Sequence, residues 1–149
     1  MTNYILTMDI GGTTFTSALF DNKLNQLAMS NEFYINDYRN KSDLITAFIS
    51  QLKKLLNEYN ISVNEIAGLG ISVPGPLDSL KGLILETPNL SILQNTNLIH
   101  LMEAELGVTV KMENDANLFV RGEWYKHYSN ESVIAGLTLG SGLGVGVVI

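Results

Sequence analysis

Asp9-Ile10-Gly11-Gly12-Thr13-Thr14 is the stretch that decides the fold of this chain. An apolar run, Tyr4–Ile10, precedes the two glycines and a second run, Thr14–Phe20, follows them, which predicts a β-hairpin. Two adjacent glycines allow a turn with positive φ and leave no side chain between the backbone and a ligand. Amides and threonine hydroxyls at such a turn can contact phosphate oxygens, and the Asp9 carboxylate can accept from the hydration shell of Mg²⁺. The alternative is an ordinary Gly-Gly hairpin turn.

The composition is typical of a folded globular protein, with 46% hydrophobic and 16% charged residues. The net charge is −6, from 9 basic and 15 acidic residues, and no basic cluster is present. We therefore expect no nucleic-acid or membrane partner, and any phosphate would be held by backbone amides and a metal ion. The absence of cysteine excludes disulfides within these residues and suits a reducing compartment. No apolar run reaches the ~18 residues of a membrane span, and the first residues do not resemble a signal peptide, so we expect a cytoplasmic protein.

The hydrophobic pattern predicts three antiparallel strands followed by alternating helices and strands. The helix Ser42–Tyr59 has apolar side chains at 3.6-residue spacing, with Ser42 as its N-cap. In the strand Ile66–Val73, Gly68 and Gly70 indicate that another segment packs against the backbone. The other expected elements are a third meander strand near Gln26–Ile35, a helix near Asn97–Leu106 ended by Gly107, a strand Val108–Met112, a helix Asp115–His127 and a strand Ser132–Leu139. This order predicts an α/β fold in which helices cover the faces of a mixed sheet.

The last residues predict a glycine-rich turn, Thr138–Gly146, followed by a strand, Val147–Ile149, of which the sequence contains only three residues. An unpaired apolar strand is a poor place for a natural chain to stop. We therefore expect the chain to be part of a longer protein, with residues 1–130 forming an N-terminal lobe and residues 131–149 opening a second lobe.

Further motifs follow in order, namely Val73-Pro74-Gly75-Pro76, Glu86-Thr87-Pro88-Asn89-Leu90, Glu113-Asn114-Asp115-Ala116-Asn117 and the turn from Thr138. Together with the Asp9 motif, they closely resemble the ROK family of sugar kinases and sugar-responsive repressors over essentially the whole chain. The resemblance implies a ribonuclease-H-like core of the actin-like ATPase superfamily. It also implies an ATP- and Mg²⁺-dependent phosphorylation of a sugar hydroxyl, on a hexose or an amino or N-acetyl hexose, by a full-length homodimer. Many members carry a zinc motif in the second lobe, outside these residues.

The resemblance also implies roles for the residues of these motifs. Two loops would grip the nucleotide, with Asp9 holding Mg²⁺ through water; their residues are Asp9, Gly11, Gly12, Thr13 and Thr14, and Thr138, Gly140, Ser141, Gly142 and Gly144. The sugar would contact Gly75, Asn89, Asn114 and Asp115, and Asp115 would be the catalytic base. The alternative for the second loop is a glycine hairpin that merely closes two strands.

Asp115 follows a predicted strand and opens a predicted helix. Its carboxylate would therefore stand at the C-terminal edge of the sheet, where open α/β sheets bind ligands. The helix N-terminus favours the ionised carboxylate, and a base that accepts a hydroxyl proton typically adds ~10²–10⁴-fold in rate. The alternative is that Asp115 or Asn114 is simply an N-cap. Pro74 and Pro76 could likewise do no more than terminate a strand.

Two rival functions differ in class. A sugar-sensing regulator of the same family would carry a helix-turn-helix segment ahead of Asp9, which lies eight residues after Met1 and leaves no room for one. An actin-like assembly protein would share the nucleotide fold but would have no need for Asn114 and Asp115 at a sugar pocket. We expect residues 1–149 alone to have little or no turnover, because half of the nucleotide site would be missing.

Overall fold

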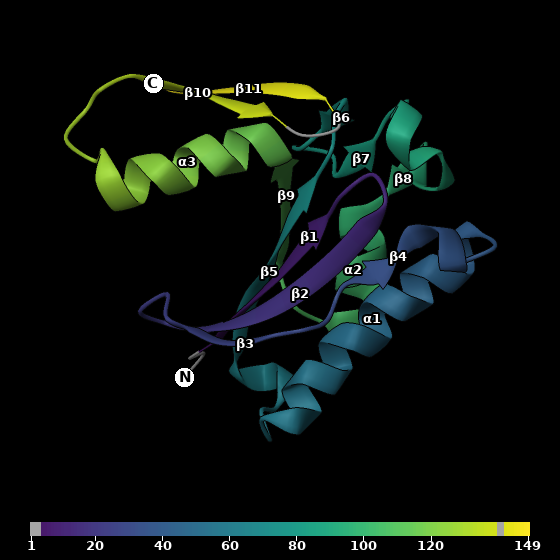
Figure 1. The fold of residues 1–149 in the computed structure, drawn as a ribbon. Helices are drawn as coiled ribbons and strands as arrows, with labels where there is room; N and C mark the ends of the chain where they lie inside the picture. Colours follow the sequence, from purple (N-terminus) through teal and green to yellow (C-terminus); the bar gives the residue numbers. More distant parts are fainter. Residues whose placement is uncertain (1–3, 140–141) are drawn as a thin grey trace.

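The computed structural model describes residues 4–139 and 142–149. Its main layer is a mixed sheet in the order β3-β2-β1-β5-β9, with β4 beside β2 (Figure 1). The strands are β1 (Tyr4–Ile10), β2 (Thr14–Asp21), β3 (Gln26–Met29), β4 (Phe33–Tyr34), β5 (Ile66–Val73) and β9 (Val110–Asn114). β1 pairs antiparallel with β2 and parallel with β5, which pairs parallel with β9. The predicted meander followed by βα units is confirmed.

Helices α1 (Lys41–Glu58) and α2 (Leu98–Leu106) cover one face of this sheet (Figure 1). The reason lies in the alternation along β1, where Leu6, Met8 and Ile10 are buried while Asp9 is exposed. Gly107 ends α2 in the left-handed conformation, with φ of 70°, as predicted. Within the described residues, no helix has the length and apolar character needed to cross a membrane.

Short elements connect these layers. A small antiparallel sheet consists of β6 (Leu77–Asp78), β7 (Leu83–Ile84) and β8 (Thr96–Asn97). The 3₁₀ turns are η1 (Ile35–Asp37), η2 (Val63–Glu65) and η3 (Pro88–Leu93). The turn after β2 is held by Asp21, whose carboxylate accepts hydrogen bonds from Asn25 and from the amide of Lys23. These bonds hold the pKa of the Asp21 carboxyl below its ordinary value.

Two predicted boundaries were wrong for local hydrogen-bonding reasons. The third meander strand does not run through residues 26–35, because the Ser30 hydroxyl accepts the Ser17 amide at 3.0 Å where a continuous ladder would place a carbonyl. The N-cap of α1 is Asn40 rather than Ser42, since Asn40 Oδ1 accepts the amide of Asp43 at 3.0 Å. In addition, β9 starts at Val110 rather than Val108.

Gly68 and Gly70 behave differently, although the sequence treats them alike. A Cβ at Gly68 would lie 3.0 Å from the carbonyl oxygen of Thr109, so the predicted close approach to β5 is confirmed there. A Cβ at Gly70 would meet no heavy atom within 4 Å, so the prediction was wrong for that residue.

The C-terminal residues form a hairpin, β10 (Ile134–Leu139) and β11 (Leu143–Val148), that packs on α3 (Asp115–His127). The prediction that β10 starts at Ser132 and the second strand at Val147 was wrong. The reason is that Gly144 and Gly146 lie inside β11, where they let the hairpin approach the helix. A Cβ at Gly136 would lie 2.5 Å from Val120 Cγ2, and one at Gly146 would lie 2.8 Å from the same atom.

Candidate active site

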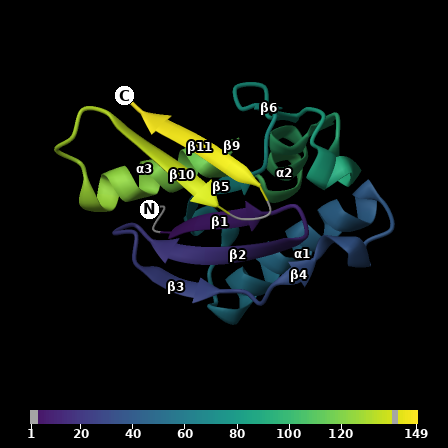
Figure 2. The same ribbon diagram turned by 45° about the horizontal axis from the view of Figure 1, so that its top comes forward.

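The C-terminal ends of three parallel strands meet at one edge of the main sheet. β1 is followed there by Gly11-Gly12, β5 by Pro74-Gly75, and β9 by Asp115 at the start of α3. A cleft of about 700 Å³ opens at this edge and is lined by Gly11, Gly12, Thr13, Pro74, Gly75, Asn114, Asp115, Ala116, Thr138, Leu139, Gly142, Leu143, Gly144 and Val145. Figure 2 shows how the β10–β11 hairpin lies over this edge of the sheet and extends towards the turn between β1 and β2.

The cleft brings together most of the residues singled out from the sequence. It includes Gly11, Gly12 and Thr13, then Gly75, Asn114 and Asp115, and finally Thr138, Gly142 and Gly144. Asp9 and Thr14 are not among its lining residues; Asp9 is exposed near the end of β1, and Thr14 begins β2. Asn89 lies in η3, but its side chain is outside the described part of the structure, as are Gly140 and Ser141.

The turn after β1 is closed by the Gly11 amide, which donates to the carbonyl of Thr14 at 2.8 Å. The prediction of a positive φ at Gly11 and Gly12 was wrong, since the described glycines with positive φ are Gly82 and Gly107. Glycine matters at this turn for space instead. A Cβ at Gly11 would lie 3.3 Å from the Thr14 carbonyl oxygen, and bare backbone there leaves the cleft open.

Asn114 and Asp115 each use one side-chain oxygen at the start of α3. Asn114 is the N-cap, and its Oδ1 accepts the amides of Ala116 at 3.0 Å and of Asn117 at 3.3 Å. Asp115 Oδ1 accepts the Ala116 amide at 2.9 Å. No hydrogen bond within the described residues engages Asn114 Nδ2 or Asp115 Oδ2. The junction therefore offers one donor and one acceptor to a ligand in the cleft.

Gly75 makes room for the Asn114 amide. A Cβ at Gly75 would lie 3.1 Å from Asn114 Nδ2, which is closer than most Cβ contacts. The two residues come from the ends of neighbouring strands, β5 and β9, whose register pairs Val73 with Asn114. The contact explains why glycine suits this position, and no sequence signal links the two residues.

No basic side chain balances the negative charge of Asp115 in the cleft, because the lining residues include neither lysine nor arginine. Asp9 of β1 pairs with Ser72 of β5, which pairs with Glu113 of β9. The carboxylates of Asp9 and Glu113 therefore lie on the same face of the sheet, and two strand spacings, about 10 Å, separate their backbones. Within the described residues, no group of three or more His, Cys, Asp or Glu side chains could hold a metal ion alone. Among the residues that line this cleft, backbone amides and hydroxyls are therefore the groups that could donate to an anionic ligand.

Part of the cleft is apolar, and none of the residues predicted from the sequence belongs to this part. Leu139, Leu143 and Val145 line it and are 84%, 68% and 57% exposed. Apolar residues alternate with glycine along residues 143–147, which is typical of a strand, whereas the glycines alone favour a loop.

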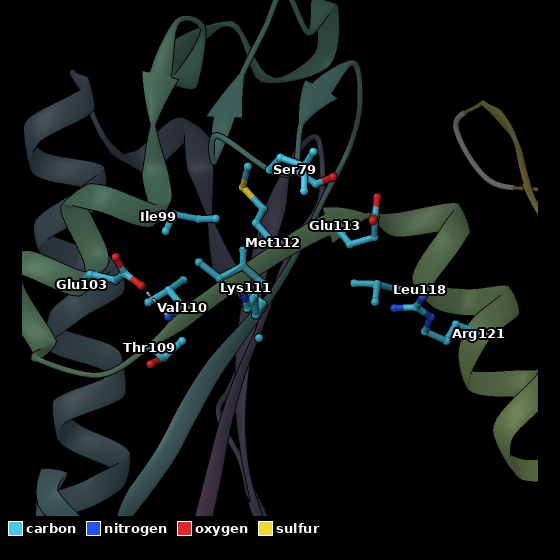
Figure 3. A pocket seen from close by; sticks show the side chains of 13 residues that line it. Ser79, Ile99, Glu103, Thr109, Val110, Lys111, Met112, Glu113, Leu118 and Arg121 are labelled. Carbon is cyan, nitrogen blue, oxygen red and sulfur yellow. Dashed lines mark hydrogen bonds between the residues drawn. The ribbon is translucent and has the colours of Figure 1, made fainter. Parts of the chain in front are cut away.

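A second hollow, of about 520 Å³, runs along the free edge of β9 (Figure 3). Lys111 and Arg121 lie on it, and Glu103 Oε1 accepts the Val110 amide at 3.0 Å there. It contains none of the residues predicted to bind nucleotide or sugar.

The family model of the ROK family matches residues 5–149. The chain belongs to the ROK family. An N-acetyl-D-glucosamine kinase of Photobacterium profundum is 33% identical to this ROK chain over 142 residues, which cover 94% of the chain and 44% of that kinase. The ROK chain thus spans less than half the length of the curated relatives it matches.

Solved structures agree on the fold. The ROK hexokinase of Thermus thermophilus superposes with a TM-score of 0.82 at 26% identity, over 98% of this ROK chain and 47% of that one. A ROK family transcriptional regulator, homologous to the E. coli MLC protein, gives 0.86 at 20% identity, over 100% and 37% of the two chains. The fold predicted from the sequence, that of an actin-like ATPase domain, is confirmed.

Proposed function

We propose that this chain is the N-terminal part of an ATP-dependent sugar kinase that phosphorylates a hexose or an amino or N-acetyl hexose. The observation that carries the proposal is the convergence of the Gly11-Gly12 turn, the Asn114-Asp115 junction and the β10–β11 hairpin on one cleft. The similarity to an N-acetyl-D-glucosamine kinase and to a ROK hexokinase supports the same reaction class.

The nucleotide phosphates would lie between the Gly11–Thr13 turn and the hairpin. Since the lining residues are neither Lys nor Arg, backbone amides and the hydroxyls of Thr13 and Thr138 would contact the phosphate oxygens. Mg²⁺ bound with the nucleotide would neutralise charge on those oxygens. Asp9 would hold it through water, which fits an exposed carboxylate at the end of β1 beside the cleft.

The sugar would lie over the β9–α3 junction. Asn114 Nδ2 would donate to a sugar hydroxyl, because its Oδ1 is already engaged by the helix amides. Asp115 Oδ2 would accept the proton of the attacking hydroxyl, while Oδ1 stays anchored on Ala116. Phosphoryl transfer depends mainly on positioning and charge stabilisation, so two side chains fixed by a helix N-terminus suit this role.

The apolar side chains of the hairpin would limit the access of water to the reacting groups. Leu139, Leu143 and Val145 line the same cleft as Asn114 and Asp115. Exclusion of water strengthens electrostatic interactions in the site and limits wasteful hydrolysis of ATP.

The test uses the full-length protein from the reading frame that contains this chain. Sugar-dependent ADP release from Mg²⁺-ATP would be followed over a panel of hexoses and N-acetylhexosamines. We expect activity on one sugar class, a loss of about 10²–10⁴-fold in Asp115→Asn, and retained sugar binding. Asp37→Asn, an exposed carboxylate of η1, is the matched control and should keep full activity.

Two other results of this experiment would contradict the proposal. Sugar binding without ADP release in wild type and variant would indicate a sugar sensor and refute the role of Asp115. Unchanged turnover in Asp115→Asn would refute that role within an active kinase.

A further inference from the structure

Glu113, the residue before the Asn114-Asp115 pair, ties β9 to the first turn of α3. Its Oε1 accepts the backbone amide of Asn114 at 2.8 Å and the Asn117 side-chain Nδ2 at 3.3 Å. We name these contacts the Glu113–Asn117 clamp. Glu113 does not line the active-site cleft; it lies on the hollow along β9, where Figure 3 shows its carboxylate at the point where the strand runs into the helix.

The clamp contacts Asn114, one of the two residues of the β9–α3 junction that line the cleft. Asn117 also donates its backbone amide to Asn114 Oδ1, so both ends of Asn114 are tied to the Glu113–Asn117 pair. Hydrogen bonds to a carboxylate are roughly twice as strong as bonds between neutral groups. The orientation of Asn114 is therefore held by two residues that do not line the cleft, and Asp115 follows Asn114 directly in the chain.

We propose that Glu113 is a positioning residue, which holds Asn114 and Asp115 in the orientation needed for phosphoryl transfer without touching sugar or nucleotide. The inference rests on the proposed function, because it assigns Glu113 a role in that reaction. A misplacement of about 1 Å at a reacting group can cost about 10²-fold in rate. A carboxylate anchored by two donors is suited to prevent such a shift.

A purely structural role for Glu113 predicts something different, namely lost stability with unchanged turnover. Glu103 provides a matched control, because its carboxylate accepts a backbone amide of the same strand at 3.0 Å, that of Val110, which lies at the other end of β9 from Asn114. Glu113→Ala removes the clamp, whereas Glu113→Gln keeps an Oε1 that can accept from both donors.

The kinetic test compares these variants in the full-length protein. We expect Glu113→Ala to lower kcat by about 10- to 100-fold, more than it raises the KM for sugar. Glu113→Gln should restore kcat to within about threefold of wild type, because a neutral acceptor replaces a charged one. Glu103→Ala should lower Tm but leave kcat unchanged. Equal kcat losses in Glu103→Ala and Glu113→Ala, or no rescue by Gln, would overturn the inference.

A second readout needs no substrate and separates this inference from the proposed function. Amide hydrogen exchange at Asn114 would be measured by NMR on the full-length protein without sugar or nucleotide. We expect the Asn114 amide to exchange at least about 10-fold faster in Glu113→Ala and near the wild-type rate in Glu113→Gln, since a hydrogen bond contributes about 1 kcal/mol or more. Unchanged exchange in Glu113→Ala would refute the clamp whether or not the protein is a kinase. An intact clamp without sugar-dependent ADP release would refute the kinase.

Discussion

Gly75 and Asn114 show how a single missing side chain can shape the candidate sugar site. A Cβ at Gly75 would press on Asn114 Nδ2 from 3.1 Å, and the amide cannot turn away without giving up the helix amides that Oδ1 accepts. We predict that Gly75→Ala weakens sugar binding by about 3- to 10-fold, the worth of one hydrogen bond of about 1 kcal/mol. Isothermal titration calorimetry of the full-length protein with its sugar measures the effect.

Gly70→Ala is the matched control, because a Cβ there would meet no heavy atom within 4 Å. Its sugar affinity should equal that of wild type. An unchanged affinity in Gly75→Ala would mean that Asn114 Nδ2 does not contact the sugar.

The start of α1 offers a direct test, because the sequence predicts Ser42 as the N-cap and the structure has Asn40 there. Asn40 Oδ1 accepts the Asp43 amide, and Asn40 Nδ2 donates to Asp43 Oδ2 at 2.9 Å. We predict that Asn40→Ala lowers the free energy of unfolding by about 1 kcal/mol, the usual worth of an N-cap. Ser42→Ala, at an exposed site inside the helix, should change it by less than about 0.5 kcal/mol. Urea unfolding of both variants decides between the two positions, and a larger effect at Ser42 would contradict the structure.

The error at α1 was avoidable from the sequence. Asn40 and Asp43 have the spacing of a reciprocal cap, in which the third helical residue bonds back to the N-cap residue. Ser42 stands nearer to the first apolar residue of the helix, Leu44, but it lies inside the helix and not at its N-cap. The interruption at Ser30 is different in kind, since its partner Ser17 lies on another strand.

Features that depend on neighbouring residues could be predicted from the sequence, whereas contacts between distant segments could not, and this holds for the candidate site as well. Strand ends followed by Gly11-Gly12, Pro74-Gly75 and Asp115 are visible in the sequence, and parallel pairing then places them at one edge. The contact between Gly75 and Asn114 depends on the register of two strands, so hydrophobic periodicity carries no information about it. The packing role of the glycines in β11 likewise requires the position of α3.

In the whole molecule, α3 and the β10–β11 hairpin form a unit with buried side chains of its own. Ala116 and Val120 are 3% and 1% exposed and face the hairpin glycines. The main core lies between the large sheet, α1 and α2, and includes neither of these two residues. The candidate active site is therefore built where two packed units meet, joined by the β9–α3 junction.

A substitution at Gly146 tests whether the α3–hairpin unit is separate from the main core. A Cβ there would lie 2.8 Å from both Val120 Cγ2 and the Ala116 carbonyl carbon, and overpacking of this kind costs about 1–3 kcal/mol. We predict that Gly146→Ala accelerates amide hydrogen exchange in β10 and β11, while β1 and β5 exchange at the wild-type rate because their side chains belong to the other core. Gly142→Ala, where a Cβ meets nothing within 4 Å, should leave both regions unchanged. If β1 and β5 lost protection together with the hairpin, the two units would unfold as one, and the junction at Asn114 could not serve as a boundary between them.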